Sequence, residues 1–182
     1  MCRPKKHWWH FTALASTVLA LLLFRIFPSP SHASIWAVEG TTKRVADGDT
    51  VTVLTLDETT LRIRLHGIDA PEIRHGRKHA QPCGDKAKRA LEEKVLGQRV
   101  IVEIHDVDRY NRVIGILRVG TRNINEEMVL EGWAWAYREY IKGPYASEFI
   151  RAEQRAREKR RGLWGLYNPQ PPWEFRRQSS SE

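Results

Sequence analysis

Alternating hydrophobic and polar positions predict several β-strands in the middle of the chain. The alternation is clearest in residues 61–65, where leucine and isoleucine occupy one face and arginine the other, as in a half-buried strand. Residues 50–53 and 100–104 show the same period with valine and isoleucine, and residues 113–119 form a further apolar run. Residues 57–60 are predicted to form the hairpin loop between the first two strands.

A helical period follows in three other segments. Residues 85–96 place alanine, leucine and valine on one face, and Gly97 follows as a predicted C-terminal cap. A short helix is predicted over residues 125–131, and a longer one begins at Ser147, carries basic residues near its end and stops at Gly162. Strands that come first, with helices interspersed and last, predict the α+β class.

The first 33 residues have the composition of a targeting segment. Three basic residues precede an apolar run from Phe11 to Phe24, and small residues at cleavage-type positions end the segment. We expect a signal peptide over residues 1–33, because the run is shorter than a spanning helix requires and Arg25 interrupts it. An uncleaved N-terminal membrane anchor is the alternative. In both cases the rest of the chain is predicted to be exported, either periplasmic or secreted, or anchored outside the cytoplasm.

Length and charge fit one further domain. The 182 residues suffice for a single domain over residues 34–175, followed by a polar, serine-rich tail over residues 176–182 that we expect to be disordered. The formal net charge of +8 falls to +4 when the four basic residues of the leader are set aside. This excess suits a polyanionic partner without identifying one. Cys83 is the only thiol after the leader, which excludes an internal disulfide.

Three polar patches interrupt the predicted elements, namely residues 47–50, 64–72 and 108–112. The carboxylates of Asp49 and Asp69 suit a hard divalent cation, and Glu72 remains to accept a proton from water. Arg64 and Arg112 supply planar, permanently charged groups that bind two phosphate oxygens at once. Phosphodiester hydrolysis needs this combination of groups.

The strand pattern predicts how two of these patches meet. Arg64 lies on the polar face of its strand, whereas Asp69 has the opposite parity, so we expect Gly67 to bend the chain and redirect Asp69. Pro71 restricts the residue before it to extended conformations. Residues 69–72 are therefore predicted to leave the sheet as a rigid corner.

The cation is less sharply specified than its ligands. Oxygen ligands favour calcium or magnesium over zinc, and calcium suits an open site whereas magnesium requires strict octahedral geometry. His75, His79 and Cys83 have a spacing that suggests zinc, but Gly76 and Pro82 argue against one helix through them. A mobile basic loop near the substrate is the simpler interpretation of that segment.

Each patch taken alone has an ordinary explanation. Asp-Gly-Asp is a common turn, Asp69 with Glu72 resembles a helix capping box, and strand arginines often form a solvated face. Their joint occurrence favours a catalytic site. The aromatic residues from Trp133 to Tyr140 either stack on unpaired bases or pack against the strands. Three later aromatic residues are predicted to clamp the C-terminus onto the domain: Trp164, Tyr167 and Trp173.

Read together, the motifs Asp-Gly-Asp-Thr, Arg-x4-Asp-x-Pro-Glu and Asp-Arg-Tyr-x-Arg resemble those of the thermonuclease family, the staphylococcal-nuclease-like proteins. The resemblance extends from about Val45 to about Trp164. It implies a five-stranded OB-fold β-barrel with about three packed helices, and calcium-dependent cleavage of DNA and RNA.

The resemblance also assigns roles residue by residue. Asp49 and Asp69 become calcium ligands together with the backbone carbonyl of Ala70, where the best-known relatives have threonine. Arg64 and Arg112 become transition-state stabilisers, and Glu72 becomes the base. Three further residues match positions that contact the nucleotide's phosphates: Arg109, Tyr110 and Tyr137.

The sequence thus predicts an exported, monomeric, calcium-dependent nuclease that hydrolyses DNA and RNA with little sequence preference. The alternative is a non-catalytic OB-fold module that binds nucleic acid, with or without a membrane tether. Degenerate modules of that kind are expected to lack the arginine or glutamate positions, and this chain keeps them.

Overall fold

A computed structural model describes residues 36–74, 79–141 and 143–178 of the chain. The predicted signal peptide or anchor lies outside these ranges, and so does His75, one of the three residues with zinc-like spacing. None of the helices within the described ranges combines the length and hydrophobicity that a transmembrane segment requires.

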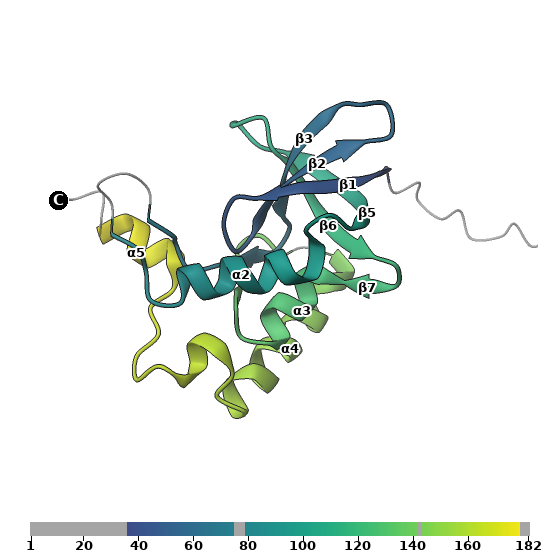
Figure 1. Ribbon diagram of the computed structural model, residues 1–182. Coiled ribbons are helices and arrows are strands. Elements are labelled where there is room, and N and C mark those ends of the chain that lie inside the picture. The colour runs from purple at the N-terminus through teal and green to yellow at the C-terminus, as the bar shows by residue number, and fades with distance from the viewer. Residues whose placement is uncertain (1–35, 75–78, 142, 179–182) are drawn as a thin grey trace, which may run out of the picture. The chain divides into compact units, whose positions relative to one another are not determined.

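Five strands form a closed barrel (Figure 1). The strands are β1 (Ala37–Val45), β2 (Thr50–Thr55), β3 (Thr60–Leu65), β5 (Arg99–Val107) and β6 (Val113–Val119). Neighbours in the order β3-β2-β1-β5-β6 are antiparallel, and a parallel pairing between β3 and β6 closes the barrel. The predicted strands and the hairpin loop between β2 and β3 are confirmed, and so is the OB-fold within an α+β architecture.

The first barrel strand, β1, is the one that the hydrophobic pattern does not predict. Its buried positions are Gly40, Thr42 and Val45, so only one of the three carries an aliphatic side chain. At Gly40 an added Cβ would lie 2.5 Å from the carbonyl oxygen of Leu54 on β2. The close approach of the two backbones therefore requires glycine where an apolar side chain would otherwise mark the strand.

Three helices pack on the barrel, as the sequence predicts. They are α2 (Gly84–Val95), α3 (Ile124–Leu130) and α4 (Ala146–Glu158), and α3 contacts both α4 and β6. In Figure 1, α2 lies across the base of the barrel, with α3 and α4 beneath it. The helix α4 ends at Glu158, four residues before the predicted stop at Gly162, because Arg160 already adopts a left-handed backbone with φ of 48°.

Two short strands form a second, two-stranded sheet. β4 (Ile68–Asp69) pairs with β8 (Trp135–Ala136), and a further short strand, β7 (Arg122–Asn123), extends the barrel sheet beside β6. Between β3 and β4 the chain turns at Gly67, whose φ is 72°, and an added Cβ there would meet Phe149 and Ile141 at 3.1 Å. The predicted bend at Gly67 is confirmed.

The C-terminal segment is more ordered than its composition predicts. A 3-10 turn, η3 (Gly162–Gly165), leads to a helix, α5 (Pro172–Gln178), so residues 176–178 are helical although the predicted tail began at residue 176. Trp164 and Trp173 both meet Trp135 edge to face, with ring centroids 4.3 and 5.7 Å away. These two tryptophans hold the segment as predicted, whereas Tyr167 is fully exposed and does not.

Candidate active site

The register of the barrel brings the first two polar patches together. Asp49 directly precedes β2, and its neighbour Thr50 pairs with Arg64 on β3. The backbone carbonyl of Asp49 accepts a hydrogen bond from the amide of Leu65 at 2.8 Å. The turn at Gly67 then returns the chain, so that Asp69 on β4 faces the same place.

Arg64 lies between two buried carboxylates. Its Nη2 donates to Oδ1 of Asp69 at 2.7 Å, and its Nη1 forms an ion pair with Asp49. The side chains of Arg64, Asp49 and Asp69 are 15%, 8% and 0% exposed. Burial opposes the charge of Arg64, but the two carboxylates outweigh it and raise its pKa. The group therefore stays cationic and fixed in position.

The two aspartates differ in how their charge is supported. Burial disfavours the Asp49 carboxylate, but Arg64 and the amide of Ala70, which donates to Oδ2 at 2.8 Å, outweigh it and lower the pKa of Asp49. For Asp69 burial dominates and raises the pKa, although two arginines oppose it. Nearby, burial and the Asp49 charge raise the pKa of Asp47 to about 7. Carboxylates are thus crowded where little water reaches them.

Glu72 lies beyond the Pro71 corner, where Gln81 fixes its backbone. The amide of Glu72 donates to Oε1 of Gln81 at 3.2 Å, and the amide of Gln81 donates back to the Glu72 carbonyl at 2.8 Å. Gly84 packs so closely that an added Cβ would lie 2.2 Å from that carbonyl. The Glu72 side chain, 26% exposed, therefore projects from a fixed backbone.

A second arginine, Arg176, completes this cluster, and the sequence analysis missed it. Arg176 on α5 binds both Asp69 and Glu72, with Nη2 2.8 Å from Asp69 Oδ2 and Nη1 2.7 Å from Glu72 Oε1. The signal was present in the proline at the first helical position, Glu174 in the first turn and basic residues in the last turn. The polar, serine-rich composition of residues 176–182 instead favoured a disordered tail, so the helix was not predicted.

The Asp108–Arg112 loop is a separate construction. Asp108 Oδ1 accepts hydrogen bonds from the amides of Tyr110 and Arg112, both at 2.9 Å, and its Oδ2 accepts one from Nε of Arg112 at 2.7 Å. Asn111 takes the left-handed conformation, with φ of 59°, that the turn needs. These local bonds set the direction of the Arg112 side chain.

Arg112 adjoins the cluster through the barrel closure. The parallel pairing sets Val113 beside Ile63, so Arg112 enters β6 next to the strand that carries Arg64. Within the described ranges no hydrogen bond or ion pair joins Arg112 to Asp49, Asp69 or Glu72. The structure thus connects Asp49, Arg64 and Asp69 by direct contacts, joins Glu72 to Asp69 through Arg176, and places Arg112 immediately before the adjoining strand β6.

The predicted substrate-binding residues fall into two places. Arg109 and Arg112 both lie against the ring of Tyr110, at 5.2 and 5.5 Å from its centroid, and Tyr110 is 61% exposed. Tyr137 lies apart from this loop. It directly follows β8, and its amide donates to the carbonyl of Gly67 at 2.9 Å. Burial, with the Asp69 charge, raises the pKa of Tyr137, which ties it to the carboxylate cluster.

The donor set fits a hard divalent cation. Asp49 and Asp69 offer carboxylate oxygens, Ala70 contacts Asp49 through its backbone amide, and no thiolate or imidazole adjoins the two aspartates in the described contacts. In the part of the chain that the structure describes, no group of three or more acidic, histidine or cysteine side chains gathers as a metal cluster. The protein would therefore supply few ligands and leave the others to water and substrate, as hard cations allow.

Sequence comparisons show which known proteins this chain is similar to. A family model described as "Staphylococcal nuclease homologue" matches residues 62–165. The chain is 37% identical over 179 residues to the micrococcal nuclease of Shigella flexneri, covering 93% of this chain and 95% of that protein. It is 39% identical over 177 residues to Protein ParB of Escherichia coli, covering 92% of each. An uncharacterized endonuclease of Haemophilus influenzae is 37% identical over 135 residues, which cover 74% of this chain and 71% of that protein.

The fold is an α+β protein of the OB-fold class, because a closed five-stranded barrel carries packed helices. Beside the barrel closure lies a cluster of carboxylates and arginine whose guanidinium suits a polyanion. Within that class the chain belongs to the staphylococcal nuclease homologue family. The resemblance that the motifs indicate is confirmed.

Proposed function

We propose that this chain is an exported, calcium-dependent nuclease that hydrolyses phosphodiester bonds of DNA and RNA with little sequence preference. One observation carries the proposal: Arg64 is held between Asp49 and Asp69 while Glu72 projects from a fixed backbone at the edge of the same cluster. This arrangement supports the proposal, because phosphodiester hydrolysis needs cation ligands, a phosphate-binding guanidinium and a base close together.

Each residue of the cluster has a task in this proposal. Glu72 accepts the proton of the attacking water, and Arg64 and Arg112 bind the phosphate oxygens that gain charge in the transition state. Asp49, Asp69 and the carbonyl of Ala70 would hold the calcium ion. When bound, that ion supplies Lewis-acid polarisation of the phosphate and a more acidic water.

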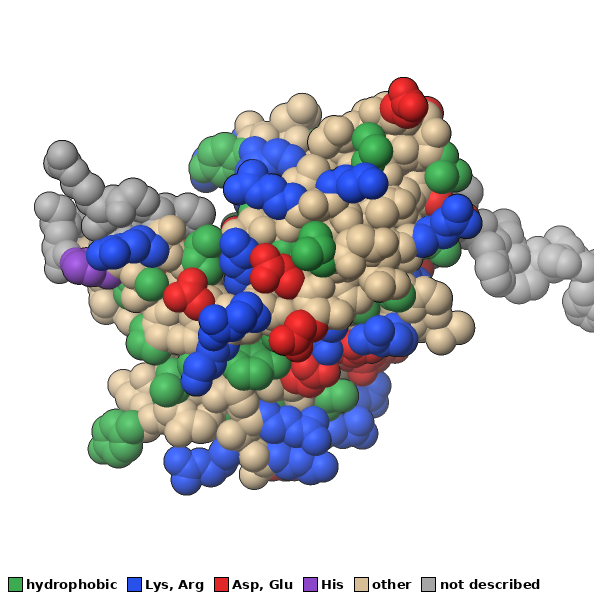
Figure 2. All heavy atoms as spheres, in the orientation of Figure 1, with side chains coloured by type: hydrophobic (Ala, Val, Ile, Leu, Met, Phe, Trp, Pro, Cys, Tyr) green, Lys and Arg blue, Asp and Glu red, His purple; other side chains and the backbone are tan. Residues whose placement is uncertain are grey.

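Substrate binding without base selection follows from the residue types around the cluster. Arg109, Tyr110 and Tyr137 are proposed to contact the phosphates of the bound strand, and such contacts carry no sequence information. Figure 2 shows Lys and Arg side chains gathered over the lower edge of the molecule, where α4 ends. The exposed basic residues of that helix and its end suit a polyanion: Arg151, Arg155, Arg157, Lys159 and Arg160.

Export remains a proposal that depends on the leader. Residues 1–33 carry the basic, apolar and small-residue regions of a signal peptide, and retention as a membrane anchor is the alternative. Fractionation of cells that express the full chain tests the point. Activity in the periplasm or medium with loss of the leader supports cleavage, and activity that remains with the membrane supports the anchor.

The test of the activity is digestion of plasmid, single-stranded DNA and RNA with calcium or with a chelator. We expect wild type to cleave all three with calcium and none in chelator. Glu72→Gln should lose about 10²–10⁴-fold in turnover, because the amide cannot accept the water proton. Glu93→Gln, on the exposed face of α2, is the matched control and should retain full activity. Cleavage that persists in chelator, or in Glu72→Gln, contradicts the proposal.

A further inference from the structure

Arg176 occupies the position at which the proposed cation ligand and the proposed base come together. Its Nη1 donates to Asp69 Oδ1 at 3.1 Å and to Glu72 Oε1 at 2.7 Å, and its Nη2 donates to Asp69 Oδ2 at 2.8 Å. One guanidinium thus contacts both oxygens of Asp69 and one of Glu72. It comes from a helix more than 100 residues further along the chain, outside the region that the family model matches.

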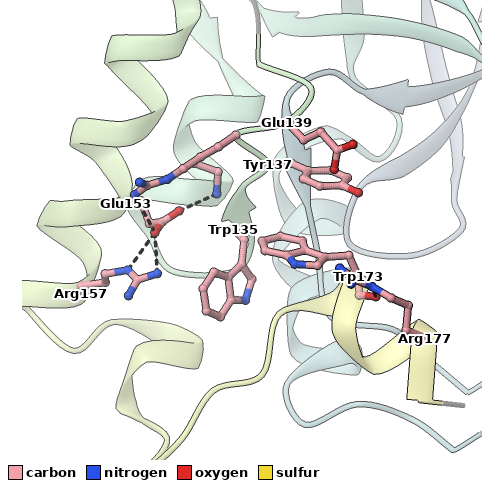
Figure 3. Close-up of a pocket in the computed structure, with 9 residues that line it drawn as sticks. Trp135, Tyr137, Glu139, Glu153, Arg157, Trp173 and Arg177 are labelled. Carbon is pink, nitrogen blue, oxygen red and sulfur yellow. Dashed lines mark hydrogen bonds and ion pairs between the residues drawn. The ribbon is translucent and has the colours of Figure 1, made fainter.

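The helix that carries Arg176 is held against the domain by aromatic packing. Trp173 stacks on Tyr137 with ring centroids 4.8 Å apart and an interplanar angle of 3°, and it meets Trp135 edge to face. In Figure 3 these rings lie together along one side of a pocket of about 290 Å³, with α5 behind Trp173. Packing of this kind holds α5 where the Arg176 side chain reaches the carboxylates of Asp69 and Glu72.

A polar tether joins the same segment to the Glu72 corner. Gln81 is 5% exposed, and its Nε2 donates to the backbone carbonyl of Gln170 at 2.6 Å. The other side-chain atom of this amide, Oε1, accepts from the amide of Glu72. One buried glutamine therefore links, by hydrogen bonds, the backbone of Glu72, the proposed base, to the segment that leads into α5.

The contacts of Arg176 conflict with those that catalysis requires. A divalent cation on Asp69 needs an oxygen that faces it, but both oxygens of Asp69 already accept hydrogen bonds from arginine. Glu72 must be free to accept a proton, yet its charge is paired with Arg176. Cation and guanidinium therefore compete for the same negative charge.

The two arginines on Asp69 differ in how readily they can leave. Arg64 is 15% exposed and also bound to Asp49, whereas the Arg176 side chain is 42% exposed on a helix of seven residues. Water reaches the Arg176 guanidinium and can solvate it when it leaves, and salt screens its pairing with the partly exposed Glu72, whereas the fully buried Asp69 needs an arriving cation to replace the lost charge. Arg176 is the partner that can swing out to water while Arg64 stays in place.

We propose that α5 is a built-in brake on the site, in which Arg176 occupies Asp69 and Glu72 until a divalent cation displaces it. The inference rests on the proposed function, because it takes Asp69 as a cation ligand and Glu72 as the base. The brake sets the cation concentration at which the site becomes competent. Below that concentration the chain holds its own cationic group between the carboxylates.

The decisive measurement is calorimetric titration of the full chain with calcium, without nucleic acid. Arg176→Met keeps the aliphatic stem and removes the charge, and we expect it to bind calcium about tenfold more tightly than wild type, which corresponds to the loss of one charge-assisted contact. Arg177→Met is the matched control: Arg177 is the exposed neighbour, and its Nε donates to the Trp173 carbonyl at 3.4 Å. Its calcium affinity should change less than twofold.

A second variant tests the helix rather than the charge. Trp173→Ala removes the ring that stacks on Tyr137, so α5 should detach and calcium should again bind more tightly, while Arg176 is still present. The calcium concentration for half-maximal cleavage should fall in both Arg176→Met and Trp173→Ala. If Arg176 itself bound the substrate, Arg176→Met would instead raise the KM for nucleic acid.

The outcomes separate this inference from the proposed function. Unchanged or weaker calcium binding by Arg176→Met overturns the brake, and so does a higher KM at unchanged calcium affinity, whether or not wild type cleaves nucleic acid. Absence of cleavage by wild type and by Arg176→Met at saturating calcium contradicts the nuclease, and the titration still decides the competition. Absence of calcium binding by both proteins overturns the brake.

Discussion

The carboxylate cluster and the Asp108–Arg112 loop carry the same kinds of side chain but are built in opposite ways. In the cluster, Asp69 is fully buried and binds arginines from two different parts of the fold. In the loop, Asp108 binds Arg112, four residues away, and two backbone amides of the same turn. Long-range packing therefore shapes one region, and local hydrogen bonds shape the other.

This difference separates stability from activity. Changes within the cluster leave a buried charge without its partner, which affects folding as well as chemistry. The loop pair is local and its side chains keep some exposure, so water can reach the carboxylate that a change at Arg112 leaves unpaired; such changes should affect substrate and transition state with little change in the free energy of unfolding. Burial raises the pKa of Asp108, but hydrogen bonds from Arg112 outweigh it and the pKa is lowered, so the loop keeps its ion pair at neutral pH.

The largest expected effect tests whether the loop arginine acts in the transition state. Arg112→Ala should lower turnover about 10²–10³-fold, because one charged donor to the phosphate is removed, and the melting temperature should stay within about 2 °C. Arg122→Ala is the matched control, since Arg122 also pairs with a carboxylate, Glu127 at 2.7 Å, but on a different strand. Wild-type turnover in Arg112→Ala would remove the loop from the mechanism.

A smaller effect tests the corner that carries the cluster. His66 lies between Arg64 and Gly67 and stacks on His105 at 4.5 Å; burial and the His105 charge lower the pKa of His66 to about 4. Tyr145 meets His105 edge to face, and Glu103 accepts a hydrogen bond from the Tyr145 hydroxyl. The histidine is therefore neutral in the folded chain down to lower pH than in the unfolded chain.

The sign of the pH dependence follows. The unfolded chain takes up the His66 proton near pH 6.5 and the folded chain only near pH 4, so this contribution to stability is complete above pH 6.5 and lost as pH falls to 4. Because the imidazole is half-buried, the loss should be about 1–2 kcal/mol. Denaturant unfolding between pH 4 and 7 measures it, and His66→Gln should show a flatter profile. Parallel profiles for both proteins would contradict the shift.

The smallest expected effect concerns the exposed aromatic ring of the loop. Tyr110→Ala removes a ring that two arginines contact, and we expect the KM for nucleic acid to rise about threefold to tenfold, as for loss of one stacking or cation–π contact. Turnover and the melting temperature should be unchanged. Tyr110→Phe keeps the ring and should match wild type. A drop in turnover would show that the ring orients Arg112 rather than the substrate.

Local patterns accounted for most elements of the fold. The alternation of valine, isoleucine or leucine with polar residues in β2, β3 and β5 reflects one buried face, which is a property of neighbouring residues. The bend at Gly67 could be foreseen because Arg64 and Asp69 have opposite parity and glycine alone accepts φ of 72° without strain. The strand β1 was not predicted, because its buried positions are a glycine, a threonine and a valine and so show no alternation of large apolar side chains.

The candidate site divides in the same way. Asp49, Arg64, Asp69 and Glu72 stand in short motifs, so their meeting could be predicted from the barrel that the motifs indicate. Gln81 and Arg176 stand in no such motif. The contacts of Arg176 with Asp69 and Glu72, and that of Gln81 with Gln170, form where the C-terminal segment docks on Tyr137 and Trp135, and docking between distant segments leaves little trace in local composition.

The amino-acid sequence by itself determined the α+β class, the strands and helices with one-sided burial, and the set of carboxylates and guanidinium groups, because these depend on side-chain type and spacing along the chain. The tertiary structure decided which arginine faces which carboxylate. That choice depends on where two segments about 105 residues apart pack together, as Arg176 does with Asp69 and Glu72, and only the folded core fixes such a distance.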